Sequence, residues 1–116
     1  MKIIVVEPFR EPYVTNIERT LDNMQRLVGG YIQAVYPFED DEDIALVCNE
    51  EGKLYDLTPN RILFRYGKPV DMIVGTFFLC SAPIDSENFE DIPDNLIDKY
   101  IKKFSFKELL KNETLC

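Results

Sequence analysis

Strand-like and helix-like patterns of apolar residues alternate along this chain. Runs rich in β-branched and aromatic residues, which favour extended strands, occupy residues 2–7, 13–17, 31–36, 44–48 and 72–80. The third run should end near Pro37, because proline cannot donate a hydrogen bond to a sheet. The run at 72–80 is almost continuously apolar, as expected of a strand that is buried on both faces. We therefore expect it at the centre of a sheet.

Two other segments place apolar residues at helical spacing. The first spans 20–28, where Thr20 suits the N-cap and Gly29 suits the position just after the helix. The second spans 93–104 and begins near Pro93, because proline is favoured in the first helical turn. The residues that share one face are Leu21, Met24, Leu27 and Val28 in the first helix, and Leu96, Ile97, Tyr100, Ile101 and Phe104 in the second.

Short polar stretches predict turns between these elements. The sequence NEEG at 49–52 lies between the extended runs 44–48 and 53–57, which predicts a β-hairpin. Further turns are expected at 58–61 and 66–69, because both stretches contain proline and the second also contains glycine. The short segment between these two turns is extended or forms one helical turn.

Together these patterns predict an α+β fold, with a mixed, mainly antiparallel sheet of about five or six strands and two helices packed on it. A length of 116 residues fits one domain, because two separate cores would each be near the lower limit of stability. We expect residues 1–104 to form this domain and residues 105–116 to be a C-terminal extension or tail.

The sequence shows no segment that would direct the chain to a membrane. The apolar run near the N-terminus is too short for a signal peptide, and no stretch reaches the ~20 apolar residues that span a bilayer. The three cysteines, Cys48, Cys80 and Cys116, lack metal-ligand spacing and suit a reducing compartment. We therefore expect a cytoplasmic protein without a membrane partner.

A net charge of −8 restricts the partners that this protein can bind. Contact with nucleic acid requires concentrated Lys and Arg, so no direct nucleic-acid binding is expected. An acidic surface attracts a basic protein, although an excess of acid also serves solubility alone. The candidate partner-binding residues are Glu39, Asp40, Asp41, Glu42 and Asp43, and the same surface would include Asp85, Glu87, Glu90, Asp91 and Asp94. A solvated loop without a binding role is the alternative.

Catalysis is not expected, and we assign no catalytic residue, cofactor or metal site. The sequence contains no histidine, which removes the commonest general base and a leading zinc ligand. Glu50 and Glu51 are adjacent, but neighbouring carboxylates on a strand-like turn point apart and do not converge on one substrate atom.

An alternative function is the binding of a small anionic ligand, such as a nucleotide. Tyr31 and Tyr55 would supply aromatic faces for the base, and Arg61 or Arg65 would pair with the phosphate. Asn60 adds an amide to the same turn as Arg61. The negative charge of the chain opposes an anionic ligand, so such a site would have to be locally positive.

Three short segments carry a resemblance to a known family: Val28–Ile32, Asn49–Lys53 and Val74–Phe78. With the sequence around them, they resemble the domain-of-unknown-function family numbered 3846, which is found in phages, plasmids and other mobile elements of Firmicutes. The resemblance covers roughly residues 1–82, and the segment after Ser86 carries little of it. It implies a mobile-element origin in a bacterial host cell, and it implies no particular activity.

Small acidic proteins of phages often antagonise host defence, which gives three hypotheses by analogy. The first is an anti-defence protein that binds and inhibits a basic host factor, such as a nuclease. The second is a sponge that sequesters a nucleotide immune signal. The third is a structural or interaction domain of another kind. A homo-oligomer, formed through an edge strand or the C-terminal helix, is compatible with each of them.

Overall fold

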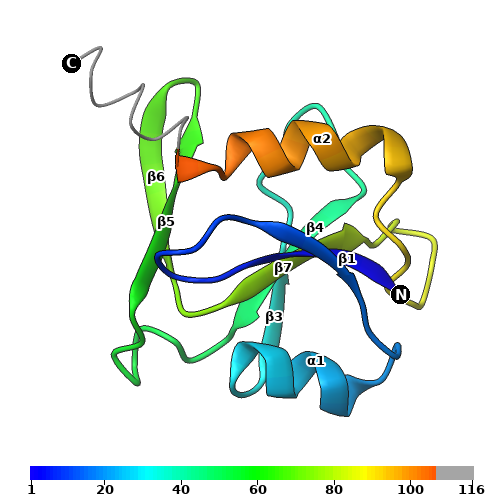
Figure 1. Ribbon diagram of the computed structural model, residues 1–116, viewed down its shortest axis with the longest axis horizontal. Helices are drawn as coiled ribbons and strands as arrows, with labels where there is room; N and C mark the ends of the chain where they lie inside the picture. The colour runs from blue at the N-terminus through cyan, green and yellow to red at the C-terminus, as the bar shows by residue number, and fades with distance from the viewer. Residues whose placement is uncertain (107–116) are drawn as a thin grey trace.

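Two antiparallel sheets and two helices form the described part of the chain, residues 1–106, in the computed structural model (Figure 1). The strands are β1 (Lys2–Val6), β2 (Tyr13–Asn16), β3 (Ile32–Val35), β4 (Ile44–Asn49), β5 (Pro59–Arg65), β6 (Lys68–Val74) and β7 (Phe77–Ser81), and the helices are α1 (Leu21–Val28) and α2 (Asp94–Lys103). The main sheet has the order β2-β1-β7-β4-β3, and β5 and β6 form a separate two-stranded sheet. All these strand pairs are antiparallel. The predicted α+β class is confirmed, with the strands divided between two sheets.

Strand β7 occupies the centre of the main sheet, between β1 and β4. All of its residues are buried, and Leu79 pairs with Ile4 on one side and with Leu46 on the other. The central buried strand predicted within the run 72–80 is therefore confirmed. The run is not one strand, however, because a backbone φ of 75° at Gly75 interrupts the extended conformation. The residues before Gly75 belong to β6 and to the smaller sheet.

Helix α1 packs on one face of the main sheet (Figure 1). Its buried residues, Met24 and Val28, belong to a cluster with alternate residues of the central strands. The sheet residues of this cluster are Ile3 and Val5 from β1, Ala45 and Val47 from β4, and Phe78 and Cys80 from β7.

Both predicted caps of α1 are confirmed. Oγ1 of Thr20 accepts a hydrogen bond from the backbone N–H of Asn23 at 3.2 Å, as an N-cap does. Gly29 ends the helix in the left-handed region, with φ of 83°, and its N–H donates to the carbonyl of Gln25 at 2.8 Å. These caps fix the point at which the chain leaves α1 and enters β3.

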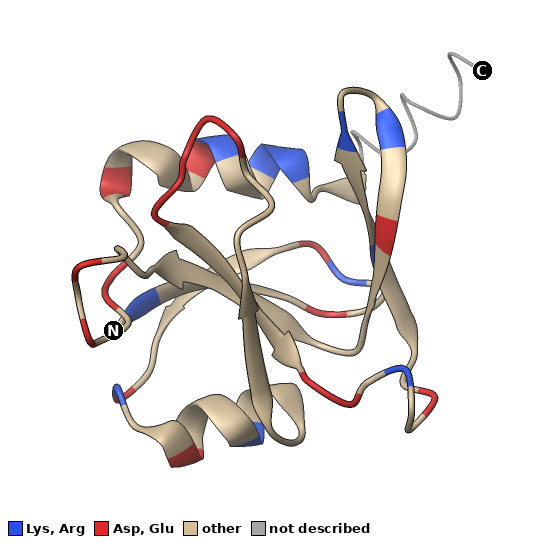
Figure 2. Ribbon diagram, turned by 180° about the vertical axis from the view of Figure 1, so that it is seen from behind, with Lys and Arg blue, Asp and Glu red and all other residues tan. Residues whose placement is uncertain are grey.

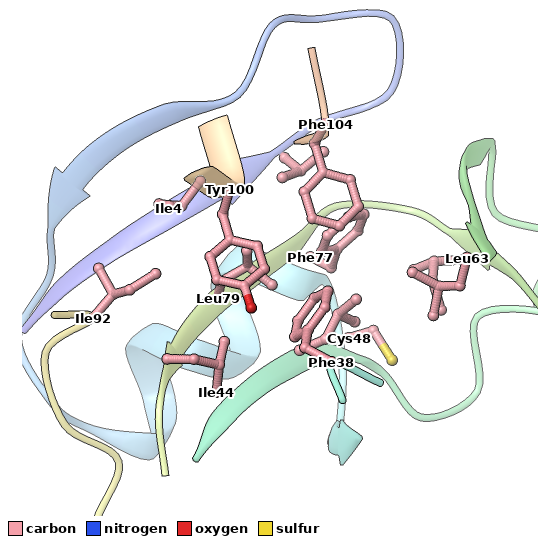
Figure 3. Close-up of a cluster of buried hydrophobic side chains, with 13 residues drawn as sticks. Ile4, Phe38, Ile44, Cys48, Leu63, Phe77, Leu79, Ile92, Tyr100 and Phe104 are labelled. Atoms are coloured by element: carbon pink, nitrogen blue, oxygen red, sulfur yellow. The ribbon is translucent and has the colours of Figure 1, made fainter. Parts of the chain in front are cut away.

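The opposite face of the main sheet is covered by α2 and by the β5–β6 hairpin (Figure 3). Tyr100 and Phe104 enter this cluster from α2, while Leu63 of β5 and Ile73 of β6 enter it from the hairpin. The rings of Phe104 and Phe77 pack edge to face, with centroids 5.5 Å apart. Because both faces carry packed elements, the central strands β1, β4 and β7 are apolar except at Lys2, Asn49 and Ser81.

The hairpin predicted around residues 49–52 is wrong. Strand β4 pairs with β3 on one edge and with β7 on the other, so no edge remains for residues 53–57. A hairpin with a two-residue turn occurs later in the chain, where Tyr66 and Gly67 connect β5 to β6. Both residues have positive φ, 53° and 76°, which matches the twist of a two-residue hairpin turn. Most of the stretch 58–61, predicted as a turn, belongs to β5 instead.

Helix α2 ends at Lys103, and the described residues continue to Phe106. The backbone N–H of Phe106 donates to Oε1 of Glu11 at 2.9 Å. The tail predicted at 105–116 otherwise lies outside the described residues. Neither helix in the described part of the chain has the length and apolar character of a membrane span.

Candidate functional site

The acidic loop, residues 39–43, connects β3 to β4 and is anchored to α2 through Asp41. Oδ2 of Asp41 lies 2.6 Å from Nζ of Lys99, and the hydroxyl of Tyr100 donates a hydrogen bond to the same oxygen. The hydrogen bond from Lys99, followed by that from Tyr100, lowers the pKa of the Asp41 carboxyl. Asp41 therefore stays a carboxylate and holds the loop against the helix.

Backbone hydrogen bonds and one aromatic ring hold the acidic loop in a defined shape. The N–H of Asp41 donates to the carbonyl of Phe38 at 3.2 Å, and the N–H of Ile44 donates to the carbonyl of Asp41 at 3.0 Å. The buried ring of Phe38 packs on Tyr100, with centroids 4.7 Å apart (Figure 3). The loop therefore begins at a packed aromatic residue and ends in a buried strand.

Three carboxylates of the acidic loop remain available to a partner. Asp40, Glu42 and Asp43 are exposed, and none of them makes an ion pair within residues 1–106. Glu39 differs, because its Oε1 lies 3.2 Å from Nε of Arg65 in β5. The predicted partner-binding residues therefore divide into two that anchor the loop and three that are free to make other contacts.

Further acidic residues lie beside the acidic loop (Figure 2). The N–H of Ala82 donates to the carbonyl of Asp43 at 2.7 Å, and Ser81 forms an isolated β-bridge with Glu90. The segment that leads to α2 therefore runs alongside the loop, and a cleft of about 440 Å³ lies between the loop and Pro93. The carboxylates carried by this segment and by the first turn of α2 are Asp85, Glu87, Glu90, Asp91 and Asp94.

Lys2 engages two of these neighbouring carboxylates. Its Nζ lies 2.7 Å from Oδ1 of Asp94, and its backbone N–H donates to Oδ1 of Asp91 at 2.9 Å. Asp91 and Asp94 are thus partly compensated within the fold.

Tyr31 and Tyr55, two residues of the predicted ligand site, line one cleft at the other end of β4. The cleft has a volume of about 350 Å³, and the two tyrosines are 65% and 66% exposed. The other residues that line this tyrosine cleft are Gln25, Gly29, Gly30, Asn49 and Glu51. No Lys or Arg is among the lining residues that the structure describes.

Asn60 and Arg61 do not join the tyrosine cleft, because their side chains bind backbone carbonyls elsewhere. Arg61 is 3% exposed, and its Nε donates to the carbonyl of Phe104 at 3.1 Å while Nη2 donates to that of Arg10 at 2.8 Å. Nδ2 of Asn60 donates to the carbonyl of Val6 at 2.9 Å. These two residues therefore tie β5 to β1, to the β1–β2 connection and to the end of α2.

Lys99 and Tyr100 complete the acidic loop, and sequence reasoning did not connect them with it. Helical spacing assigns Tyr100 to the core, and a buried tyrosine normally has a partner for its hydroxyl. The sequence therefore indicated that the hydroxyl of Tyr100 would need a hydrogen-bond partner. Nothing in the sequence identifies Asp41 as the acceptor, or Arg65 as the partner of Glu39.

Within residues 1–106 the possible metal ligands are dispersed and the cysteines are buried. No group of three His, Cys, Asp or Glu side chains in this range is arranged to hold a metal ion. Cys48 and Cys80 are buried free thiols. Burial raises the pKa of Cys80 to about 12, so this thiol is protonated and unreactive at neutral pH.

The model of one protein family, described as a domain of unknown function (DUF3846), matches residues 1–105. This confirms the family suggested by the sequence and extends the match through α2. No curated protein and no solved structure matches the chain significantly. Two of the three segments that carry the resemblance, Val28–Ile32 and Asn49–Lys53, supply most of the tyrosine cleft. The third, Val74–Phe78, contains Gly75, where β6 passes into β7.

Proposed function

The chain belongs to the DUF3846 family, whose function is unknown, and from that premise we propose that it inhibits a basic protein by binding it through the acidic loop. In this proposal the chain comes from a phage or mobile element and acts in the bacterial cytoplasm. Its partner is a host defence factor, such as a nuclease, and the inhibitor itself performs no catalysis.

The observation that carries the proposal is the anchored acidic loop with outward carboxylates. Asp41 is held by α2, so Asp40, Glu42 and Asp43 are presented on a loop of defined shape. A binding segment that is already ordered loses less conformational entropy on association. Carboxylates at fixed positions suit a protein groove rich in Lys and Arg, and such grooves are what nucleases use to hold phosphate backbones.

The geometry supports a protein partner better than a nucleotide. A nucleotide site needs a cation or backbone amides for the phosphate, and the described lining of the tyrosine cleft contains no Lys or Arg. Arg61 is buried and bonded to backbone carbonyls, and Arg65 pairs with Glu39. The cations suggested for a nucleotide sponge are therefore engaged elsewhere in the fold.

Inhibition of purified nucleases tests the proposal. The full chain is added to a panel of bacterial restriction and RNA-guided nucleases, and DNA cleavage is measured against inhibitor concentration. We expect stoichiometric inhibition of at least one nuclease, which weakens as the salt concentration rises because screening reduces charge complementarity. The triple variant Asp40→Lys, Glu42→Lys, Asp43→Lys keeps the Asp41 anchor and should weaken inhibition at least about tenfold.

A charge-matched control separates the acidic loop from net charge. Glu11→Lys, Glu18→Lys and Asp22→Lys reverse three exposed carboxylates that lie outside the loop and do not line the tyrosine cleft. This control should inhibit like the unmodified chain. Equal weakening by both triple variants would attribute binding to overall charge, and failure to inhibit any nuclease in the panel would remove the proposal.

A further inference from the structure

We propose that the tyrosine cleft binds the guanidinium group of an arginine side chain from a basic protein partner. The cleft is distinct from the acidic loop, because the loop precedes β4 whereas Asn49, Glu51 and Tyr55 lie at and beyond its other end. The inference rests on the proposed function for the basic nature of the partner. It adds a second contact with that partner, in which aromatic rings and a carboxylate bind one arginine side chain.

The walls of the tyrosine cleft are joined by backbone hydrogen bonds. The N–H of Glu50 donates to the carbonyl of Tyr31 at 2.8 Å, and the N–H of Tyr55 donates to the carbonyl of Glu51 at 3.1 Å. The N–H of Glu51 also donates to Oδ1 of Asn49 at 2.8 Å. The turn that carries Glu51 and Tyr55 is therefore tied to the segment of Tyr31 before any ligand arrives.

The floor of the cleft is formed by the glycine pair and by Asn49. Asn49 is 8% exposed, and its Nδ2 donates to the carbonyl of Val28 at 3.2 Å. A Cβ at Gly30 would lie 2.8 Å from the same Nδ2, which is closer than real Cβ atoms approach. Glycine at position 30 therefore lets the Asn49 side chain pack against the backbone, and no side chain of residue 30 occupies the cleft.

The chemistry of the cleft matches a planar cation. The face of a tyrosine ring carries negative partial charge and attracts cations, and arginine in particular stacks on aromatic rings. Glu51 adds a carboxylate, and the amides of Gln25 and Asn49 add polar atoms. With no Lys or Arg among the described lining residues and a net charge of −8, the cleft repels anions. Both tyrosines are largely exposed, so a partner side chain can reach their rings.

Nuclear magnetic resonance titration of the full chain tests the assignment directly. The probe is a short peptide of alternating glycine and arginine with neutral, capped ends. The sequence contains six tyrosines and no tryptophan, so the ring signals are few enough to follow individually. We expect saturable shifts of the Tyr31 and Tyr55 rings and of the Glu51 amide. A matched glycine–lysine peptide should bind more weakly, and a glycine–glutamate peptide should give no shifts.

Variants of the cleft then measure each contribution. Tyr31→Ala and Tyr55→Ala should each weaken binding of the arginine peptide about three- to thirtyfold, the range of cation–π contacts. Glu51→Gln should weaken it about two- to fivefold, as for a partly exposed ion pair. Tyr66→Ala is the matched control, because Tyr66 is 85% exposed at the hairpin turn and does not line this cleft. Thermal unfolding of each variant verifies that the fold is retained.

The outcomes separate this inference from the proposed function. Unchanged peptide affinity in folded Tyr31→Ala and Tyr55→Ala would overturn the cleft assignment, and so would shifts of these rings with adenosine monophosphate but not with the arginine peptide. If loop reversal abolishes nuclease inhibition while the cleft variants bind peptide normally, the inference falls and the proposed function stands. If the peptide binds in the cleft but no nuclease is inhibited, the cleft assignment is supported and the proposed function is not.

Discussion

The hydroxyl of Tyr100 donates a hydrogen bond to the carboxylate of Asp41, although 59 positions separate the two residues in the sequence. The bond joins α2 to the acidic loop beside the buried ring of Phe38. Lys99, the neighbour of Tyr100 in α2, pairs with the same carboxylate. The shape that the loop presents to a partner therefore depends on where α2 is packed.

Tyr100→Phe removes this hydrogen bond and keeps the ring. We expect the free energy of unfolding to fall by about 1–2 kcal/mol, because hydrogen bonds to charged groups contribute more than neutral ones. Tyr36→Phe is the matched control, since the hydroxyl of Tyr36 donates to the neutral carbonyl of Ala82 at 3.3 Å. Its effect should stay below about 1 kcal/mol. Urea unfolding followed by circular dichroism measures both variants, and a larger loss in the control would contradict the expectation.

Acid should weaken the anchor of the acidic loop. The hydrogen bonds from Lys99 and Tyr100 lower the pKa of Asp41 in the folded protein, relative to about 3.9 for an aspartate in an unfolded chain. A lowered folded-state pKa adds stability that is fully present above about pH 4 and is lost as the pH falls through the folded-state value. Asp41→Asn cannot titrate, so it should lose less stability than the unmodified chain between pH 7 and pH 3.

Asp71→Asn is the control for this pH dependence. The hydrogen bond from Lys53 also lowers the pKa of Asp71, but the Asp71 side chain is 47% exposed whereas that of Asp41 is 16% exposed. Solvent screening should make its contribution smaller. Urea unfolding at the two pH values measures the difference. Parallel losses in Asp41→Asn and in the unmodified chain would show that Asp41 is not a source of acid sensitivity.

Arg61 should contribute more to stability than any other cation of the described chain. Arg61→Ala would leave the carbonyl of buried Phe104 and that of Arg10 without their donors, and we expect a loss of about 2–4 kcal/mol. Arg61→Lys should recover little, because one ammonium group cannot reach donor positions that are set by a planar fork. Arg65→Ala removes an exposed ion pair and should cost less than about 1 kcal/mol. Comparable losses in denaturant unfolding at positions 61 and 65 would refute this ranking.

Two glycines with nearly the same φ should respond differently to alanine. Gly75 has φ of 75°, and an added Cβ would lie 2.8 Å from Cδ1 of Leu57. Gly67 has φ of 76° and has no atom within 4 Å of an added Cβ. Gly67→Ala should therefore cost about 1 kcal/mol for backbone conformation alone. Gly75→Ala should cost more, and equal shifts in unfolding midpoint would mean that Leu57 moves aside freely.

The sequence predicted those elements that are determined by residues close together in the chain. Thr20 and Gly29 cap α1 through contacts inside that helix, so their roles are legible in the sequence. The hairpin was misplaced because the stretch NEEG at 49–52 does form a turn, yet β4 already has partners on both edges. One of these partners, β7, begins only at Phe77, so the residues around 49–52 carry no signal of this pairing.

The candidate site was predicted only in part, because its contacts join residues that lie far apart in the sequence. The run of acids at 39–43 is visible in composition, but the distinction between anchoring Asp41 and free Asp40 depends on α2. The turn predicted at 58–61 favours an exposed, ligand-binding Arg61, whereas β5 places this residue in the interior. The pairing of Tyr31 with Tyr55 in one cleft follows from the tertiary course of the chain.

The central position of β7 has a consequence for synthesis on the ribosome. Strands β1 and β2 form one hairpin, and β3 and β4 form another, but only β7 hydrogen-bonds to both. A nascent chain that stops before residue 77 therefore has the two hairpins of the main sheet with no strand between them. Long-range pairing of this kind is slow and leaves apolar edges uncovered until it occurs. The order of translation thus delays closure of the main sheet until β7 has emerged.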